Sequence, residues 1–158
     1  MSLLREIKKL RPFASLEQEA MLNVLRTNDQ YDIRFARLFR QHGLTSPQYN
    51  ILRILRGEGA PLPILEIAGR TIAVVPGITG LIDRLEEAGY VHRRRCNSDR
   101  RVIHVGLTEK GKKILSVLDQ PIQDLHQKLM GHMSKTELNH LVRLLEKARE
   151  GLDKLVED

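Results

Sequence analysis

Apolar positions in the first half of the chain recur with the spacing of helices. The clearest stripe falls at three- and four-residue steps, which places its side chains on one face of a helix, toward a core: Ile78, Leu81, Ile82 and Leu85. The pattern predicts four helices in this half. Their expected ranges are about Ser15–His42, Ser46–Arg56, Leu62–Gly69 and Pro76–Ala88.

Residues that start and stop helices set these bounds. In a capping box a hydroxyl accepts a hydrogen bond from the first turn, while a Gln or Glu three residues later reaches back to the cap. The chain matches this pattern at Ser15–Gln18, Thr45–Gln48 and Ser134–Glu137. Glycine ends helices in the left-handed conformation at little cost, and the expected stops are Gly43, Gly57 and Gly89.

The period of the pattern changes after Gly89. Tyr90–Arg93 and Val102–Leu107 alternate as strands do, and Asn97-Ser98-Asp99 between them suits a tight turn. The order is helix, short helix, helix and hairpin. This order predicts a mainly α fold, a winged helix-turn-helix with a two-stranded wing.

The remaining residues are helical again. Thr108 is expected to cap a helix that Pro121 bends. In the last helix the apolar residues form a narrow coiled-coil seam: Leu138, Leu141, Leu145, Ala148, Leu152 and Leu155. The seam has two interpretations, packing against the chain's own first helix or against a second copy. We favour a homodimer, because the terminal helices lie outside the winged region and need a cover.

We therefore expect three regions along the chain. Residues 1–42 contain the first helix and contribute to dimerisation, 43–107 form the DNA-binding winged region, and 108–158 hold the C-terminal dimerisation helices. The residues expected to form the dimer contact are Leu141, Leu145, Ala148, Leu152 and Leu155.

The composition of the chain is typical of a globular protein. Hydrophobic residues make up 41% of the 158 residues and charged residues 29%, which supplies a core and is unlike a disordered chain. No apolar run approaches the length of a membrane span, and the N-terminus lacks the features of a secretory signal. We expect a cytoplasmic protein, and the single cysteine, Cys96, agrees with a reducing compartment.

Charge points to a polyanionic partner. The net charge is +6, and the stretch from Tyr90 to Lys113 holds eight Lys and Arg residues against two acids, Asp99 and Glu109. The excess of the whole chain therefore lies in the predicted hairpin and just after it. Such a concentration of cations suits a nucleic acid.

At three places the residues resemble the MarR family of transcriptional regulators. These are Leu44–Leu52 (LTSPQYNIL), Ile78–Val91 (ITGLIDRLEEAGYV), and Asp99–Arg101 (DRR) followed by Val105–Gly111 (VGLTEKG). The resemblance implies a homodimer with interlocking terminal helices and one winged region per subunit on each half of a pseudo-palindromic operator. It also implies a repressor that a small anionic or phenolic ligand, or an oxidant, releases from DNA.

The helix predicted from Pro76 has an outer face that suits the major groove, where short or hydrogen-bonding side chains reach base edges. Thr79 can contact a base edge. Arg84 has two interpretations, a phosphate contact or a surface arginine paired with Glu86 or Glu87. The candidate DNA contacts of this region are Arg70, Thr71, Pro76, Gly77, Thr79, Gly80 and Arg84.

The chain departs from the family pattern at this helix. Val75-Pro76-Gly77 and Gly80 stand where relatives have Ser or Thr and a larger polar residue. The glycines favour either a close approach of the backbone to DNA, with N–H groups on a phosphate, or a helix that begins a turn later. With fewer base-reading side chains, specificity depends more on the wing and on DNA shape.

The predicted wing concentrates arginines. Its candidate DNA contacts are Arg93, Arg94, Arg95, Ser98, Asp99, Arg100 and Arg101. By resemblance, Asp99 braces Arg101 while an arginine near the tip enters the minor groove, where the potential over narrow A·T tracts is most negative. The alternative is a solvated charged loop.

An effector pocket is expected between the winged region and the dimerisation helices. Its candidate ligand-binding residues are Tyr31, Arg34, Phe35 and Tyr49, which offer aromatic walls and a cation for a carboxylate or phenolate. The alternative is that Phe35 and Tyr49 are core residues.

Other chemistry finds little support in the sequence. A lone cysteine among arginines could be oxidised, but Cys96 has no resolving partner and is interpreted as incidental. The six histidines show no metal-ligand spacing, so we expect neither a metal nor a cofactor. Without a phosphate loop or nucleophile elbow we expect no enzyme. The alternative function is a nonspecific, architectural DNA-binding protein.

Overall fold

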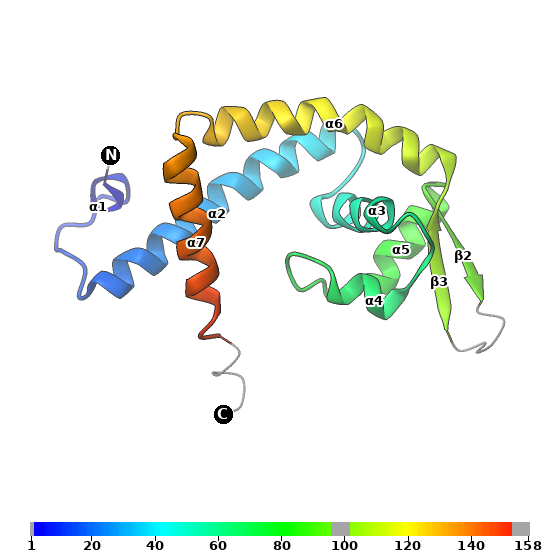
Figure 1. Ribbon diagram of the computed structural model, residues 1–158, viewed down its shortest axis with the longest axis horizontal. Coiled ribbons are helices and arrows are strands. Elements are labelled where there is room, and N and C mark those ends of the chain that lie inside the picture. Colours follow the sequence, from blue (N-terminus) through cyan, green and yellow to red (C-terminus); the bar gives the residue numbers. More distant parts are fainter. Residues whose placement is uncertain (1, 96–101, 153–158) are drawn as a thin grey trace. The chain divides into compact units, whose positions relative to one another are not determined.

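The computed structural model describes residues 2–95 and 102–152 (Figure 1). The chain forms two compact units, Met1–Pro121 and Ile122–Asp158. Its elements in order are α1 (Leu3–Glu6), α2 (Leu16–Gln41), α3 (Ser46–Glu58), β1 (Leu62–Pro63), α4 (Ile64–Gly69), α5 (Ile78–Glu87), β2 (Val91–Arg95), β3 (Ile103–Leu107), α6 (Glu109–Met130) and α7 (Lys135–Arg149). The mainly α fold with a winged helix-turn-helix is confirmed.

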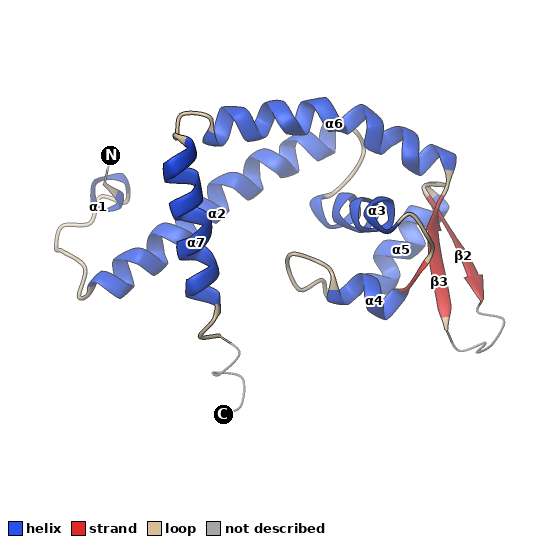
Figure 2. Cartoon of the chain, viewed as in Figure 1, coloured by secondary structure: helices blue, strands red, loops and turns tan. Residues whose placement is uncertain are grey.

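The sheet has one strand more than the sequence predicted. Its three antiparallel strands lie in the order β1-β3-β2 (Figure 2). The short β1 pairs Leu62 with Val105 and Pro63 with His104. The expected helix over Leu62–Gly69 was therefore wrong at its start, because the first two residues join the sheet and α4 begins at Ile64.

Side-chain caps fix most helix starts as expected. Thr45 and Ser134 both form complete capping boxes. At Ser15 the box is only half formed: the Ser15 hydroxyl accepts from the Gln18 N–H at 3.2 Å, but Oε1 of Gln18 accepts from the N–H of Ala14 at 2.9 Å. The prediction for the Gln18 side chain was wrong by one residue.

Two predicted helix ends were wrong. Gly57 lies inside α3, which continues to Glu58 and ends at Gly59 in the left-handed conformation. Pro76 does not open α5, because Gly77 adopts a left-handed conformation (φ 68°, ψ 36°) as the N-cap and the helix begins at Ile78. The helix therefore begins two residues later than predicted, which is less than the full turn of the alternative interpretation.

The core of the first unit lies between the helices and the inner face of the sheet. α3 contacts β3, α5 contacts β2, and α3 contacts α5. The fully buried side chains include Ile51, Leu52, Ile67, Ile82, Leu85, Val105, Leu115 and Leu118. Burying each such side chain contributes about 1.5–3 kcal/mol, so this core fixes which face of α5 points outward.

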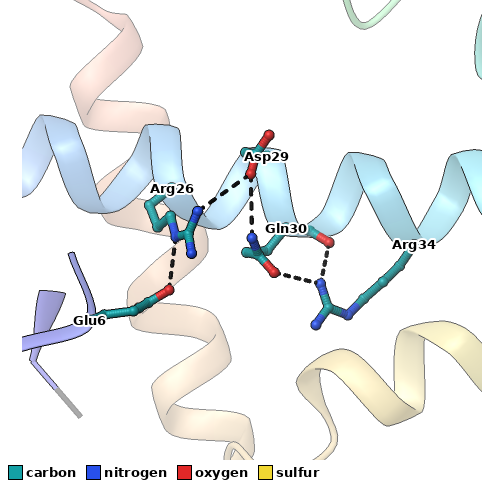
Figure 3. Close-up of polar contacts among 5 residues, drawn as sticks. All are labelled: Glu6, Arg26, Asp29, Gln30 and Arg34. Carbon is teal, nitrogen blue, oxygen red and sulfur yellow. Dashed lines mark hydrogen bonds and ion pairs between the residues drawn. The ribbon is translucent and has the colours of Figure 1, made fainter.

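The N-terminal segment forms a short helix that the sequence did not predict. Leu3 of α1 is buried, and Glu6 accepts from Nε of Arg26 on α2 at 2.8 Å (Figure 3). Both side chains of this pair are 41% exposed, so the pair adds little to stability. Among the described residues, no helix is long and apolar enough to cross a membrane.

Candidate DNA-binding surface

The outer face of α5 presents the polar side chains expected of a recognition helix. Ile82 and Leu85 are fully buried, which leaves Thr79, Asp83 and Arg84 exposed on the other side. Arg84 forms no ion pair with another described residue, whereas Glu86, one of its two expected partners, bonds to Arg93. Arg84 is thus an exposed cation on a helix whose inner face is held by the core.

The start of α5 is open. Pro76 and Gly77 are exposed, Gly80 is half-buried, and the N-cap has no side-chain hydrogen bond. A Cβ added at Gly77 or at Gly80 would meet no atom within 4 Å. Packing within the chain therefore does not require glycine at position 80, where φ is ordinary.

Arg93 on β2 ties the wing to α5. Its Nη2 lies 2.6 Å from Oδ1 of Asp83, and its Nη1 donates to Oε2 of Glu86 at 3.2 Å. Nη2 also donates to the carbonyl of Thr79 at 3.3 Å, and the Arg93 N–H donates to Oε1 of Glu86 at 3.0 Å. With 23% of its side chain exposed, Arg93 is a brace between strand and helix.

The next two arginines differ from Arg93. Arg94 and Arg95 are exposed and form no ion pair within residues 2–95 and 102–152. In the β2–β3 register Arg94 lies opposite His104 and Arg95 opposite Ile103, so the two side chains project from opposite faces of the wing. The wing therefore offers cations on both faces.

The remaining wing candidates, Ser98, Asp99, Arg100 and Arg101, lie outside the described residues, as does Cys96. The expected strands were close to the observed ones. β2 starts at Val91 and extends two residues further than predicted, to Arg95, while β3 starts one residue later, at Ile103.

Arg70 and Thr71, the two candidates between α4 and α5, both form hydrogen bonds within the fold. Arg70 donates to Glu58 at 2.6 Å and to Glu66 at 3.1 Å, and these bonds raise the pKa of its guanidinium. Thr71 is half-buried and donates to the carbonyl of Ala68 at 2.8 Å. Two carboxylates already neutralise Arg70, which distinguishes it from Arg84, Arg94 and Arg95.

The acidic partners of Arg93 were not predicted from the sequence. Asp83 and Glu86 are three residues apart on α5 and so share a helix face, but no sequence signal indicates that Arg93, seven residues after Glu86, returns to that face.

The hydrogen bonds at the base of the wing were not predicted either. Thr108 Oγ1 donates to the Gly89 carbonyl at 2.7 Å and accepts from the Gly111 N–H at 3.1 Å, so the expected cap of α6 also binds the end of α5.

The candidate effector residues form an aromatic stack in part. The Phe39 ring lies 4.4 Å from that of Tyr49 and 6.1 Å from that of Phe35, and burial raises the pKa of the Tyr49 phenol. Arg34 donates through Nη1 to the carbonyl and Oε1 of Gln30 at 2.6 and 2.9 Å (Figure 3). Phe39 is almost fully buried, while Phe35 and Tyr49 stacked on it are half-buried, so the pocket and core interpretations of these two rings both stay open.

Two hollows of about 300 and 310 Å³ lie elsewhere in the first unit. The first is lined by Leu4, Pro12, Phe13, Ser15, Leu16 and Glu19, and the second by Leu55, Arg56, Gly59, Ala60, Pro61, Leu107, Lys112 and Ser116. Neither is lined by Tyr31, Arg34, Phe35 or Tyr49, so the effector site stays a prediction. Over the described ranges, no three His, Cys, Asp or Glu side chains gather as a metal site.

The predicted dimer seam lies on a helix with no buried side chain. In α7 Leu141 and Leu145 are half-buried while Ala148 is exposed, and after it Leu152 is 53% exposed. Leu155 lies outside the described residues. The apolar residues Val142 and Leu144 beside the seam are also more than half exposed.

Comparison with known proteins places this geometry in a family. The MarR family model matches residues 44–103, which run from the segment just before α3 to the start of β3. A crystal structure of a MarR transcription factor from Planctomyces limnophilus is 41% identical, covers 85% of this chain and 98% of its own, and superposes with a TM-score of 0.67. The chain belongs to the MarR family. Members of this family are transcription regulators that bind DNA and act as dimers, and this member is a DNA-binding regulator and not an enzyme.

Further relatives are also transcription regulators. The transcriptional regulator YkoM of Bacillus subtilis is 30% identical over 110 residues, which cover 69% of this chain and 70% of YkoM. The homoprotocatechuate degradative operon repressor of Escherichia coli is 27% identical over 112 residues, or 71% of this chain and 75% of the repressor. The structure of AbsC from Streptomyces coelicolor, at 25% identity, covers 91% of this chain and 99% of its own with a TM-score of 0.80.

Proposed function

We propose that this MarR-family protein is a sequence-specific repressor that binds a pseudo-palindromic operator as a homodimer. The outer face of α5 enters the major groove, and the β2–β3 wing lies along the adjacent minor groove. The observation that carries this proposal is the division among the arginines: Arg84, Arg94 and Arg95 are exposed without a carboxylate partner among the described residues, while Arg70 and Arg93 are paired.

This division matters because phosphate binding depends on free cations. An arginine that neutralises a phosphate releases condensed counterions, and each such contact steepens the salt dependence of binding by about 0.9. An arginine already held by two carboxylates releases fewer. The DNA contacts are therefore assigned to Thr79 and Arg84 on α5 and to Arg94 and Arg95 on the wing, with Pro76, Gly77 and Gly80 at the open helix start.

The C-terminal unit supports the dimer. No side chain of α7 is fully buried: Leu141 and Leu145 are half-buried, Ala148 is exposed, and Leu152 after the helix is 53% exposed. A second copy that packs on the seam of Leu141, Leu145, Ala148 and Leu152 would cover apolar surface that otherwise faces water. Two-fold symmetry then places the half-site centres about 34–36 Å apart, or a multiple of that distance.

Repression and release by a ligand complete the proposal. The E. coli relative is named a repressor, which supports the same sign of regulation here. The ligand we propose is a small anionic or phenolic molecule, with the Tyr49 ring and the Arg34 guanidinium as its contacts. Tyr31 and Phe35 on α2 would supply the rest of the wall.

Binding to the DNA upstream of the protein's own gene tests this function. The full-length protein is titrated against that fragment and against random DNA of equal length, across a salt series. A regulator prefers its site by orders of magnitude at physiological salt, whereas an architectural protein binds both fragments equally. Equal binding, also with fragments from neighbouring operons, contradicts the proposal.

A panel of benzoate, 4-hydroxybenzoate and phenol then tests release. We expect one of them to lower the affinity for the preferred fragment, and Arg34→Ala to reduce the effect of the carboxylates more than that of phenol. Release that is unchanged by Arg34→Ala and by Tyr49→Phe contradicts the assigned ligand contacts.

A further inference from the structure

The loop between α4 and α5 exposes apolar side chains beside the open start of α5. Ile72 is 86% exposed and Val74 93% exposed, and Ala73 between them is exposed as well. Single apolar residues on a surface are ordinary. Three in a row, in the segment that leads into a DNA-binding helix, need a reason.

The loop is also free of charge. Residues 71–77 read Thr-Ile-Ala-Val-Val-Pro-Gly, and the arginine before them, Arg70, is held by Glu58 and Glu66. The loop therefore offers no charged side chain for a phosphate. Its exposed groups suit an apolar feature of the partner.

The position of the loop limits which part of the partner it meets. Val74 precedes the N-cap Gly77 by three residues, so its backbone lies at most roughly 11 Å from the helix start. Residues at the start of a recognition helix contact base edges in the major groove. The single apolar feature of those base edges is the 5-methyl group of thymine.

The first turn of α5 leaves room for such a role. Its residues Ile78, Thr79 and Gly80 supply one polar side chain, so hydrogen-bonding readout by this turn is sparse. Valine and isoleucine are branched at Cβ and stiff at χ1. They therefore lose little side-chain entropy when they pack against a methyl group.

We propose that Ile72 and Val74 read thymine by contact with its 5-methyl group in the major groove, next to the bases that face α5. This inference rests on the proposed sequence-specific function. It assigns part of the sequence selection to an apolar loop.

The test compares thymine with uracil, which lacks only the methyl group. Full-length protein selects its preferred site from a pool of randomised duplexes. The selected duplex is then made with deoxyuridine in place of thymidine, one symmetry-related pair at a time. Removing one buried methyl costs roughly threefold to fivefold in affinity, so at the contacted pair we expect a loss of roughly ten- to twentyfold.

The variants locate the contact. Val74→Ala and Ile72→Ala should each weaken binding to the thymine duplex, and at least one of them should bind thymine and uracil forms within twofold at the contacted pair. Leu65→Ala is the control, because Leu65 on α4 is 85% exposed but lies before the loop, and this variant should keep the full methyl effect. Circular dichroism checks that each variant is folded, and Val74→Thr, which keeps the branched shape and one methyl, should keep part of the effect.

Each other outcome overturns the inference. A selected site that binds equally with thymine and uracil at every position removes the methyl contact and leaves the sequence-specific function intact. A methyl effect that survives in both alanine variants assigns it to another residue. Variants that change the oligomeric state but not DNA binding assign the loop to a second copy or another protein. A pool from which no site is enriched refutes the sequence-specific function itself, and the loop assignment with it.

Discussion

α5 and α7 are both amphipathic helices, but of the two only α5 has apolar side chains that are fully buried. Ile82 and Leu85 of α5 are fully buried, whereas no residue of α7 is buried. The inner face of α5 is satisfied, so its outer face is presented in a fixed orientation and is available for DNA. The apolar face of α7 is only half-buried, and we propose that a second copy covers the rest. In this proposal α5 serves the fold and the DNA contact together, and α7 serves dimer assembly.

The largest effect on the free energy of unfolding is expected from the buried face of α5. Leu85→Ala removes a fully buried side chain, and we expect it to lower the free energy of unfolding by about 2–5 kcal/mol. Leu144→Ala on α7, where the side chain is 54% exposed, should change it by about 0.5 kcal/mol or less. Denaturant unfolding at one protein concentration measures both, and similar costs would remove the contrast between the helices.

The next effect concerns the seam of α7. Leu145→Glu places a charge on each side of the proposed dimer contact, and we expect the dissociation constant of the dimer to rise at least a hundredfold, or about 2.7 kcal/mol. Sedimentation across a concentration series measures it. Arg143→Glu, on the exposed side of α7, is the control and should stay dimeric. If Leu145→Glu sediments as a folded dimer, the seam packs within one chain.

Two neighbouring arginines on β2 test separately the DNA contact and the contact between the wing and α5. Arg94→Ala removes a free cation, so DNA affinity should fall and the salt slope should flatten by about 0.9 for each phosphate that is no longer neutralised, or roughly two for a dimer. Arg93→Ala removes the brace to Asp83 and Glu86. It should lower the free energy of unfolding by about 1 kcal/mol and weaken DNA binding with little change in slope. Titrations at several salt concentrations separate the two, and an equal flattening of the slope in both variants would contradict the brace.

The smallest effect is expected at the start of α5. Gly80→Ala should stabilise the free protein by up to about 1 kcal/mol, because a Cβ there meets no atom within 4 Å. If DNA approaches the backbone at this position, the same change should weaken DNA binding. Gly57→Ala in α3 is the matched control, since a Cβ there also meets open space, and it should stabilise without a change in affinity. Unchanged DNA binding by Gly80→Ala would remove position 80 from the contact surface.

Local patterns were enough to predict most of the helices and the wing, but not α1. The stripe around Ile82 and the hydroxyl caps at Thr45 and Ser134 act within one or two turns, so they can be read from neighbouring residues. β1 was missed because two residues carry no period, and Leu62 becomes a strand only by pairing with Val105. Gly57 and Gly59 can both end a helix, and the predicted end at Gly57 was wrong.

The candidate site was predictable in its location and less so in its members. A cluster of arginines in the hairpin was plain from the sequence, but the roles of Arg93 and Arg94 depend on which face of β2 meets α5. The carboxylates of Asp83 and Glu86 on α5 meet that face of β2, and this approach depends on the tertiary fold. Arg70 was likewise predicted as a DNA contact without its partners Glu58 and Glu66. Charge patterns identify cations, and the fold determines which of them are free.

The brace at Arg93 also bears on how a ligand could release DNA. Four contacts from one residue join β2 to α5, so we expect α5 and the base of the wing to move together. A ligand that separated the wing from α5 would have to break the pairs of Arg93 with Asp83 and Glu86, and it would leave both carboxylates without their cation. An effector of the proposed kind would therefore need less free energy to change the distance between the two DNA-binding regions of the dimer, so that they no longer match successive grooves, than to deform either region.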